Sequence, residues 1–298
     1  MPRRNQPQAL LPQQAEAHVR STTIFPAGLL AGTCAFGVYL VTVAPGIPGG
    51  DAGELVAESC HLGTAHPPGY PLFTLLNHMT TRGIPPLLEY VGFSSGTEAD
   101  GGASPAWYAN ATASIMGALA VLFTAQTTLL LLRPRWGWRY VLLRELASGC
   151  AALLMAFSPL TWQYSVTAEV FALNNFLLSL LCSLVVRFSL RRELATATGG
   201  ALVSGLALSN QHTAVLYVAP LAAWVMLQLK RQLHPWRRLS LEAVLLAAVF
   251  LLGLAPYAFL PLAAKRAPKR GSWGNVTTWS GFLHHIRRGD YGSLRLYS

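Results

Sequence analysis

Two carboxylates that follow a glycine-rich turn are the first candidates for chemistry. Asp51 and Glu54 stand three residues apart in the segment PGIPGGDAGEL, so they share one face if a helix begins there. They could divide the work of a general base and its orienting partner. They could equally form a capping-box-like pair, with Asp51 as the N-cap and Glu54 three residues into the helix. The spacing alone favours capping and leaves catalysis open.

A histidine and a third carboxylate extend this set. His66 precedes Pro67 and Pro68, which favour an extended backbone before the next helix, and a hydrogen bond to a backbone carbonyl is the ordinary role of a single histidine. Glu169 lies in TWQYSVTAEVFALNNF, between two apolar runs and a few residues from membrane depth. Because removing an ionisable group from water costs free energy, a carboxylate at this depth indicates a functional role for Glu169. The competing role is an ion pair with a basic loop residue.

The C-terminal tail concentrates basic residues that could bind an anion. Such a cluster could hold a phosphate, for which arginine is suited by its bidentate geometry, or it could bind anionic lipid head groups. Asn210 and His212 lie in a short turn between apolar runs and are further candidates for donor binding. The basic residues of the tail are Lys265, Arg266, Lys269, Arg270, Arg287, Arg288 and Arg295.

Modification and metal sites give weaker signals. Two sequons, at Asn110 and Asn275, are potential glycosylation sites, although Asn110 stands close to an apolar run. The sequence contains no Walker loop, GxGxxG, HExxH or GxSxG motif, and its cysteines form no CxxC pair. We therefore expect neither a metal nor a cofactor. The four cysteines are Cys34, Cys60, Cys150 and Cys182.

The composition is that of a membrane protein, which defines the elements that must position these groups. Of 298 residues, 52% are hydrophobic and only 11% are charged, well below the roughly 25% charged residues of soluble domains. The net charge of +10 is better explained by loop residues that set membrane topology than by nucleic-acid binding. We predict an all-α polytopic membrane protein with about seven spans. The apolar runs are 24–44, 110–132, 145–160, 167–186, 196–209, 213–229 and 240–263.

The distribution of basic residues predicts the orientation of these spans. Residues 1–23 and the segments 133–144, 187–192 and 230–238 hold fourteen bases, whereas the long loop 45–109 holds one. The positive-inside rule then places the N-terminus in the cytosol and the 45–109 loop on the far side. The basic tail is the exception.

Within the loop, an i, i+3, i+4, i+7 pattern predicts a helix that lies in the membrane interface, formed by Leu72, Leu75, Leu76 and Met79.

Three regions follow from these patterns. Residues 1–23 are predicted to be a disordered cytosolic N-terminus, and residues 24–263 a membrane domain that includes the loop 45–109. Residues 264–298 form a basic tail on the far side, which we expect to be the start of a longer C-terminal region.

Several strings together resemble a known family. GDAGELVAESCHLGTAHPPGYPL, with AEVFALNNF, GLALSNQHT and SWGNVTTWSGFLHHIRRGDYG, is similar to polytopic GT-C glycosyltransferases of the transmembrane protein 260 type, which are protein O-mannosyltransferases. The similarity spans about residues 24–298. Longer members of the family continue with further spans and a soluble helical-repeat domain, so the resemblance predicts a C-terminally shortened form.

The resemblance implies a multi-pass enzyme of the endoplasmic reticulum membrane, with the first long loop in the lumen. Its donor would be the lipid-linked sugar dolichyl phosphate mannose. Its acceptors would be Ser or Thr hydroxyls of folded extracellular domains, namely the IPT domains of plexin-like receptors. In GT-C enzymes the acid after the first span is catalytic, and here it corresponds to Asp51, with Glu54 as its neighbour. Glu169 matches the acidic position between the third and fourth spans, and His66 and His212 match motif positions.

The chemistry implied is an inverting displacement. It requires a base that deprotonates the acceptor hydroxyl and cations that stabilise the departing phosphate. Asp51 would supply the base without a metal ion. The cations would come from the tail, from Arg266, Arg270 or Arg288.

Two other readings compete with this one. A secondary transporter or channel could use Asp51, Glu54 and Glu169 as ion sites. Transport sites lie near the bilayer midplane between repeats, whereas these acids are predicted at one edge and no repeat is visible, which favours the transferase. A short form without activity could instead bind the acceptor or the full-length enzyme.

Overall fold

The computed structural model describes residues 26–90, 103–132, 138–232, 236–266 and 271–291. Within these ranges every regular element is a helix, which confirms the all-α prediction for this part of the chain. Residues 1–23, predicted to be a disordered segment, lie outside the described ranges.

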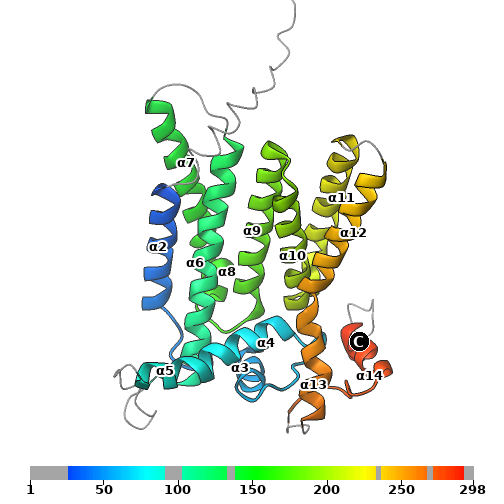
Figure 1. The fold of residues 1–298 in the computed structure, drawn as a ribbon. Coiled ribbons are helices and arrows are strands. Elements are labelled where there is room, and N and C mark those ends of the chain that lie inside the picture. The colour runs from blue at the N-terminus through cyan, green and yellow to red at the C-terminus, as the bar shows by residue number, and fades with distance from the viewer. Residues whose placement is uncertain (1–25, 91–102, 133–137, 233–235, 267–270, 292–298) are drawn as a thin grey trace, which may run out of the picture.

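The long helices run side by side and form a bundle (Figure 1). Helix α6 packs against α2, α7 and α9, and α10 packs against α9 and α12. Small residues allow these close approaches: at the α2–α6–α7 contact the core contains Ala31, Ala35, Ala125 and Ala152. The bundle consists of α2 (Pro26–Val41), α6 (Pro105–Leu131), α7 (Trp138–Ala156), α9 (Val170–Arg191), α10 (Leu194–Asn210), α11 (Val215–Gln232) and α12 (Trp236–Gly253).

Helices α10 and α12 approach each other closely at two glycines. A Cβ atom added at Gly205 would lie 2.2 Å from the carbonyl oxygen of Phe250, and one added at Gly253 would lie 2.4 Å from that of Leu202. Both contacts are far shorter than van der Waals distance, so each position admits only glycine without movement of the backbone.

The count of membrane spans differs from the prediction of about seven. In the described part of the chain, three helical segments are long and apolar enough to cross a membrane: Pro105–Leu131, Val170–Arg191 and His212–Arg231. Two bent pairs bring the number to five if each pair is one span. The remaining two predicted spans are helices of 16 and 17 residues, α2 and α10.

Prolines account for the bent pairs. Helix α7 is followed by α8 (Pro159–Ser165) at an angle of 72°, and α12 is followed by the turn η4 (Ala255–Ala258) and α13 (Phe259–Lys265) at 46°. Pro159 and Pro256 stand at the first positions of the new helical segments, where proline is tolerated because no intrahelical N–H is needed. Apolar runs that read as single segments are therefore broken.

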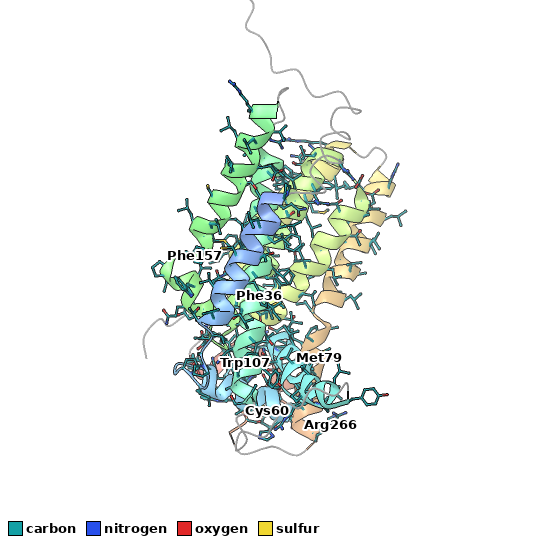
Figure 2. The ribbon with its side chains drawn as sticks, turned by 90° about the vertical axis from the view of Figure 1, so that its left-hand side faces the viewer. Phe36, Cys60, Met79, Trp107, Phe157 and Arg266 are labelled. Carbon is teal, nitrogen blue, oxygen red and sulfur yellow. The ribbon has the colours of Figure 1, made fainter. Side chains whose placement is uncertain are left out.

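Short helices lie across one end of the bundle, as predicted for the 45–109 loop (Figure 1). They are α3 (Ala52–His61), α4 (Pro71–His78), a π-helical turn (Met79–Gly83) and α5 (Ile84–Tyr90). Helix α4 falls where the leucine pattern predicted it. In Figure 2, Cys60, Met79 and Arg266 all lie at this end, beyond the bundle residues Phe36 and Phe157.

The C-terminal tail folds back onto the same end. Its elements are α14 (Trp279–Ile286) and a 3₁₀ turn (Gly289–Tyr291), and they follow α13. The backbone N–H of Trp273 donates to the carbonyl of Thr64 over 2.8 Å, and the hydroxyl of Ser272 donates to Glu58 over 2.6 Å. The tail is thereby fixed to the loop that carries His66.

Candidate active site

Asp51 occupies the N-cap position of α3 and Glu54 lies three residues later, as the spacing predicted, but the side-chain hydrogen bonds of a capping box are not formed. Among the described residues, the Asp51 side chain makes no capping hydrogen bond. Its backbone N–H instead donates to Oε1 of Glu169 over 3.0 Å. Gly50, with φ of 63°, makes this approach possible, since a Cβ atom there would lie 2.9 Å from the same oxygen. The capping-box interpretation is therefore wrong.

Glu54 is directed towards His66. One carboxylate oxygen accepts the backbone N–H of His66 over 2.6 Å, and both oxygens lie 3.1 to 3.2 Å from ring Nδ1. The other ring nitrogen, Nε2, lies 3.2 Å from the Tyr70 hydroxyl and 3.7 Å from Oδ2 of Asp51. The expected backbone-carbonyl partner of the ring is thus replaced by carboxylates and a phenol. His66 connects Glu54 to Asp51.

These contacts change the titration of both partners. The hydrogen bond to Glu54 raises the pKa of His66, although burial opposes it. Burial alone would raise the pKa of Glu54, but the hydrogen bonds and charge of His66 outweigh it and the pKa is lowered. Both shifts favour the ion pair of a histidinium and a carboxylate.

The segment before α4 is a turn. The N–H of Gly69 donates to the carbonyl of His66 over 2.8 Å, so the lead into α4 is not simply extended. Tyr70 follows with φ of 40° and precedes α4. Burial raises the pKa of Tyr70 to about 12, so its hydroxyl keeps its proton at neutral pH.

Glu169 is buried at the N-terminus of α9, where it lies against the first turn of α3. It accepts hydrogen bonds from the backbone of Asp51 and Ala52, the first donors of α3. A carboxylate there satisfies free N–H groups and interacts favourably with the helix dipole. Burial, followed by the charge of Asp51, raises the pKa of Glu169. The alternative role, an ion pair with a loop base, is not seen in the described part of the chain.

Of the predicted tail bases, Arg288 reaches this cluster. Its charge acts on His66 and Tyr70, and its guanidinium carbon lies 5.3 Å from the centre of the Tyr291 ring. Lys265 and Arg266 are exposed at the end of α13, and neither forms a described hydrogen bond or ion pair with the carboxylates. Arg266 instead lines a cavity of about 310 Å³ with residues 61–64 and 272–274. Arg270 lies outside the described residues.

Asn210 and His212 are structural ties near the site. The amide of Asn210 is buried and donates to the carbonyl of Val170, the residue after Glu169, over 3.0 Å. Nε2 of His212 lies 2.7 Å from the hydroxyl of Tyr257. The turn between α10 and α11 is thereby held to α9 and to η4, which explains why polar residues interrupt the apolar sequence there.

The two sequons differ in accessibility. Asn110 is fully buried: its amide nitrogen donates to the carbonyls of Ala44 and Gly46 over 2.7 and 2.9 Å, and its oxygen accepts the N–H of Ala168 over 2.7 Å. In the folded chain it is closed to modification, and it ties the end of α2 to the Glu169 segment. Asn275 is exposed, so glycosylation there stays a prediction.

Several site residues carried no recognisable signal in the sequence. Tyr70 lies 5.0 Å from His66 between ring centres, and Trp273 and Tyr291 lie at 6.4 and 6.5 Å. Glu58 is buried one turn after Glu54 and holds the tail through Ser272. All are in the strings that resemble the GT-C family, but their types alone did not separate site residues from interfacial aromatics. No group of three or more metal-binding side chains is assembled among the described residues.

Comparison with known proteins decides the family. Residues 51–234 match the family model of the N-terminal domain of protein O-mannosyl-transferase TMEM260. The chain belongs to this family. It is 37% identical over 264 residues to the TMEM260 O-mannosyl-transferase of Mus musculus and 32% identical over 292 residues to that of Dictyostelium discoideum, which covers 87% and 94% of this chain. No solved structure matches it.

The extent of the TMEM260 match bears on the site. This chain spans about a third of the length of the two relatives, 33% and 32% respectively. The family model begins at Asp51 and includes Glu54, His66, Glu169 and His212, whereas Arg288 lies beyond its end. The carboxylate and histidine cluster therefore belongs to the TMEM260 N-terminal domain, and the tail adds a base and two aromatic rings to it.

Proposed function

We propose that this chain carries the catalytic site of a membrane-embedded protein O-mannosyltransferase. The donor is dolichyl phosphate mannose, and the acceptors are Ser or Thr hydroxyls of proteins. The observation that carries the proposal is the cluster at one end of the helix bundle. There Asp51 and Glu54 flank His66, Glu169 binds the backbone of Asp51, and the charge of Arg288 acts on His66. The names of the relatives support mannosyl transfer to protein.

Asp51 is the general base in this proposal. Its side chain is 61% exposed, whereas that of His66 is 11% exposed, so Asp51 is the member of the pair that an acceptor can reach. It takes the proton from the acceptor hydroxyl as the oxygen attacks the anomeric carbon of mannose. The bond from that carbon to the phosphate oxygen breaks in the same step, which inverts the configuration.

Glu54, His66 and Glu169 are positioning residues. Glu54 fixes the ring of His66 through Nδ1, which leaves Nε2 directed at Asp51 and Tyr70. Glu169 holds the first turn of α3 and therefore the backbone of Asp51. A catalytic base must be held within hydrogen-bond reach of its target, and these contacts define its position from two sides.

The departing dolichyl phosphate requires positive charge. Arg288 is next to the cluster, and a guanidinium can contact two phosphate oxygens at once. Lys265, Arg266 and Arg270 are further donor-binding candidates from the sequence. The reaction needs no cofactor, and we expect it to proceed without a metal ion.

The setting of the reaction is the lumenal face of the endoplasmic reticulum membrane. The asymmetry of basic residues supports a cytosolic N-terminus and a lumenal 45–109 loop. The short helices of this loop lie at the end of the bundle that carries the cluster (Figure 1). Acceptors would be folded receptor domains of the IPT type. An end position, away from the middle of the bundle, does not favour the transporter alternative.

The test is mannosyl transfer by the membrane-inserted chain from dolichyl phosphate mannose to an IPT-type acceptor. We expect mannosylated Ser or Thr with the anomeric configuration inverted relative to the donor, and transfer that persists in EDTA. A retained configuration would contradict single displacement. Transfer only after the C-terminal part of the Mus musculus relative is added would favour the binding short form, and ion or solute flux in proteoliposomes without transfer would favour a transporter.

A further inference from the structure

An aromatic surface at the edge of the carboxylate cluster has no role in the steps above. Trp273 is 38% exposed and Tyr291 is 42% exposed. Their rings are nearly parallel, with an interplanar angle of 25° and centres 6.3 Å apart. A large apolar surface that stays exposed beside charged groups is informative, because burial of these rings would be favourable.

Both rings are held against the site. Each presents an edge-to-face contact to His66, at 70° for Trp273 and 78° for Tyr291. The backbone of Trp273 is fixed by its hydrogen bond to Thr64, two residues before His66. Arg288 lies over the Tyr291 ring at 5.3 Å. The surface is therefore continuous with the cluster on one side and with a base on the other.

A membrane-interface belt is the ordinary reason for exposed tryptophan, and the same tail contains an example for comparison. Trp279 is 72% exposed on α14, and its ring stacks on Phe282, with centres 5.7 Å apart. Neither residue has a described ring contact with His66 or Tyr70. The tail thus contains two stacked aromatic pairs, of which one adjoins the cluster.

We propose that the Trp273–Tyr291 surface binds the mannosyl ring of the donor. This inference rests on the proposed function and assigns the sugar subsite of the same active site. A pyranose presents a face of C–H groups that packs on an aromatic ring, while its hydroxyls at the rim remain free for polar partners. The charged neighbours fit this ligand, because Asp51 and Tyr70 lie around His66 and Arg288 adjoins Tyr291, where the phosphate on the anomeric carbon would follow.

The test compares binding of dolichyl phosphate mannose with binding of dolichyl phosphate, which lacks the sugar, to the chain in nanodiscs. We expect Trp273→Ala to weaken binding of the mannosylated lipid by about three- to tenfold, in line with aromatic stacking energies, and to leave dolichyl phosphate unchanged. Trp273→Phe keeps a ring and should retain most of the affinity. Trp279→Ala, the matched control, should change neither lipid.

Each outcome decides the proposal. An equal loss for both lipids would mean a contact to the lipid or head group and would overturn it, as would unchanged discrimination in Trp273→Ala. If Trp273→Ala alters the elution profile of the chain, Tyr291→Ala makes the same comparison at an independent position. Failure of the proposed function is separate: it would appear as sugar-dependent binding by the wild-type chain without any transfer.

Discussion

Glu169 leaves two nearby carboxylates available for chemistry. The start of α3 needs acceptors for its free N–H groups, and the sequence spacing favoured Asp51 and Glu54 for that purpose. Glu169 meets this need from 118 residues away, so Asp51 is left exposed and Glu54 is left to bind His66. The local spacing could predict where the helix starts. It could not predict that Glu169 accepts the free N–H group of Asp51, because Glu169 comes from another helix.

The pair of His66 and Glu54 predicts how stability depends on pH. The folded pKa of His66 is raised above 6.5, so its contribution is fully present below about pH 6.5 and is lost as pH rises through the folded value. The folded pKa of Glu54 is lowered from 4.5, so its contribution is present above that value and is lost as pH falls through the folded pKa. The contact therefore stabilises most between about pH 4.5 and 6.5.

Thermal unfolding of the wild-type chain and of His66→Gln between pH 4 and 9 measures this contribution. We expect the difference in Tm between them to be largest between about pH 4.5 and 6.5 and to shrink as pH rises through the raised pKa of His66. Arg238→Gln, which breaks the i, i+4 ion pair of an exposed arginine with the buried Glu242, is the control and should show no such maximum, because that pair contains no histidine. A difference in Tm for His66→Gln that grows from pH 6 to 9 would contradict the ion pair.

Hydrophobic periodicity located the helices better than it located their ends. Each predicted apolar run falls on a helix or a bent pair, and the leucine pattern placed α4 within one residue at each end. The breaks at Pro159 and Pro256 turned two runs into angled pairs, because proline cannot continue the hydrogen-bond ladder of the preceding helix. Whether a proline bends or ends a segment depends on tertiary packing, which one sequence does not contain.

The contact between α10 and α12 predicts a sharp difference between two glycines of one helix. A Cβ at Gly205 would meet the backbone of Phe250 at 2.2 Å, whereas one at Gly199 would meet only the methyl groups of Leu184, at 3.8 Å. Gly205→Ala should destabilise the chain by about 1–3 kcal/mol through overpacking. Gly199→Ala should be neutral or stabilise by up to about 1 kcal/mol, since alanine is the better helix former.

The measurement is the Tm of each variant in detergent, with elution profiles as a check on association. Equal effects of the two substitutions would show that the helices are not in the close contact described.

The site is assembled from three distant parts of the chain at one end of the molecule. The loop after α2 contributes residues 51–70, and the junction before α9 contributes Glu169. The tail contributes Arg288 and the Trp273–Tyr291 pair. The charge distribution predicted that these parts share one side of the membrane. It gave no sign of the contacts that join them, since one bond that holds the tail is the backbone hydrogen bond from Trp273 to Thr64, which any residue type except proline could donate.

The seven-base tail is partly explained by this assembly. The charge of Arg288 acts on His66 and Tyr70, whereas Lys265 and Arg266 lie at the end of α13 without a described contact to the carboxylates, and Arg270 is outside the described residues. Residue type alone could not rank these bases, because the ranking depends on how the tail folds back after α13. Under the proposed function, this placement makes Arg288 the first tail residue to test for binding of the donor phosphate.

Mannosyl transfer by Asp51→Asn tests the assignment of the catalytic base most directly. The variant keeps the backbone N–H that binds Glu169 but removes the base, so we expect the rate to fall by at least about 100-fold while membrane insertion and donor binding persist. Glu193→Gln, an exposed acid at the N-terminus of α10, is the control and should transfer at the wild-type rate. Transfer by Asp51→Asn at the wild-type rate would contradict the role of Asp51 as the base.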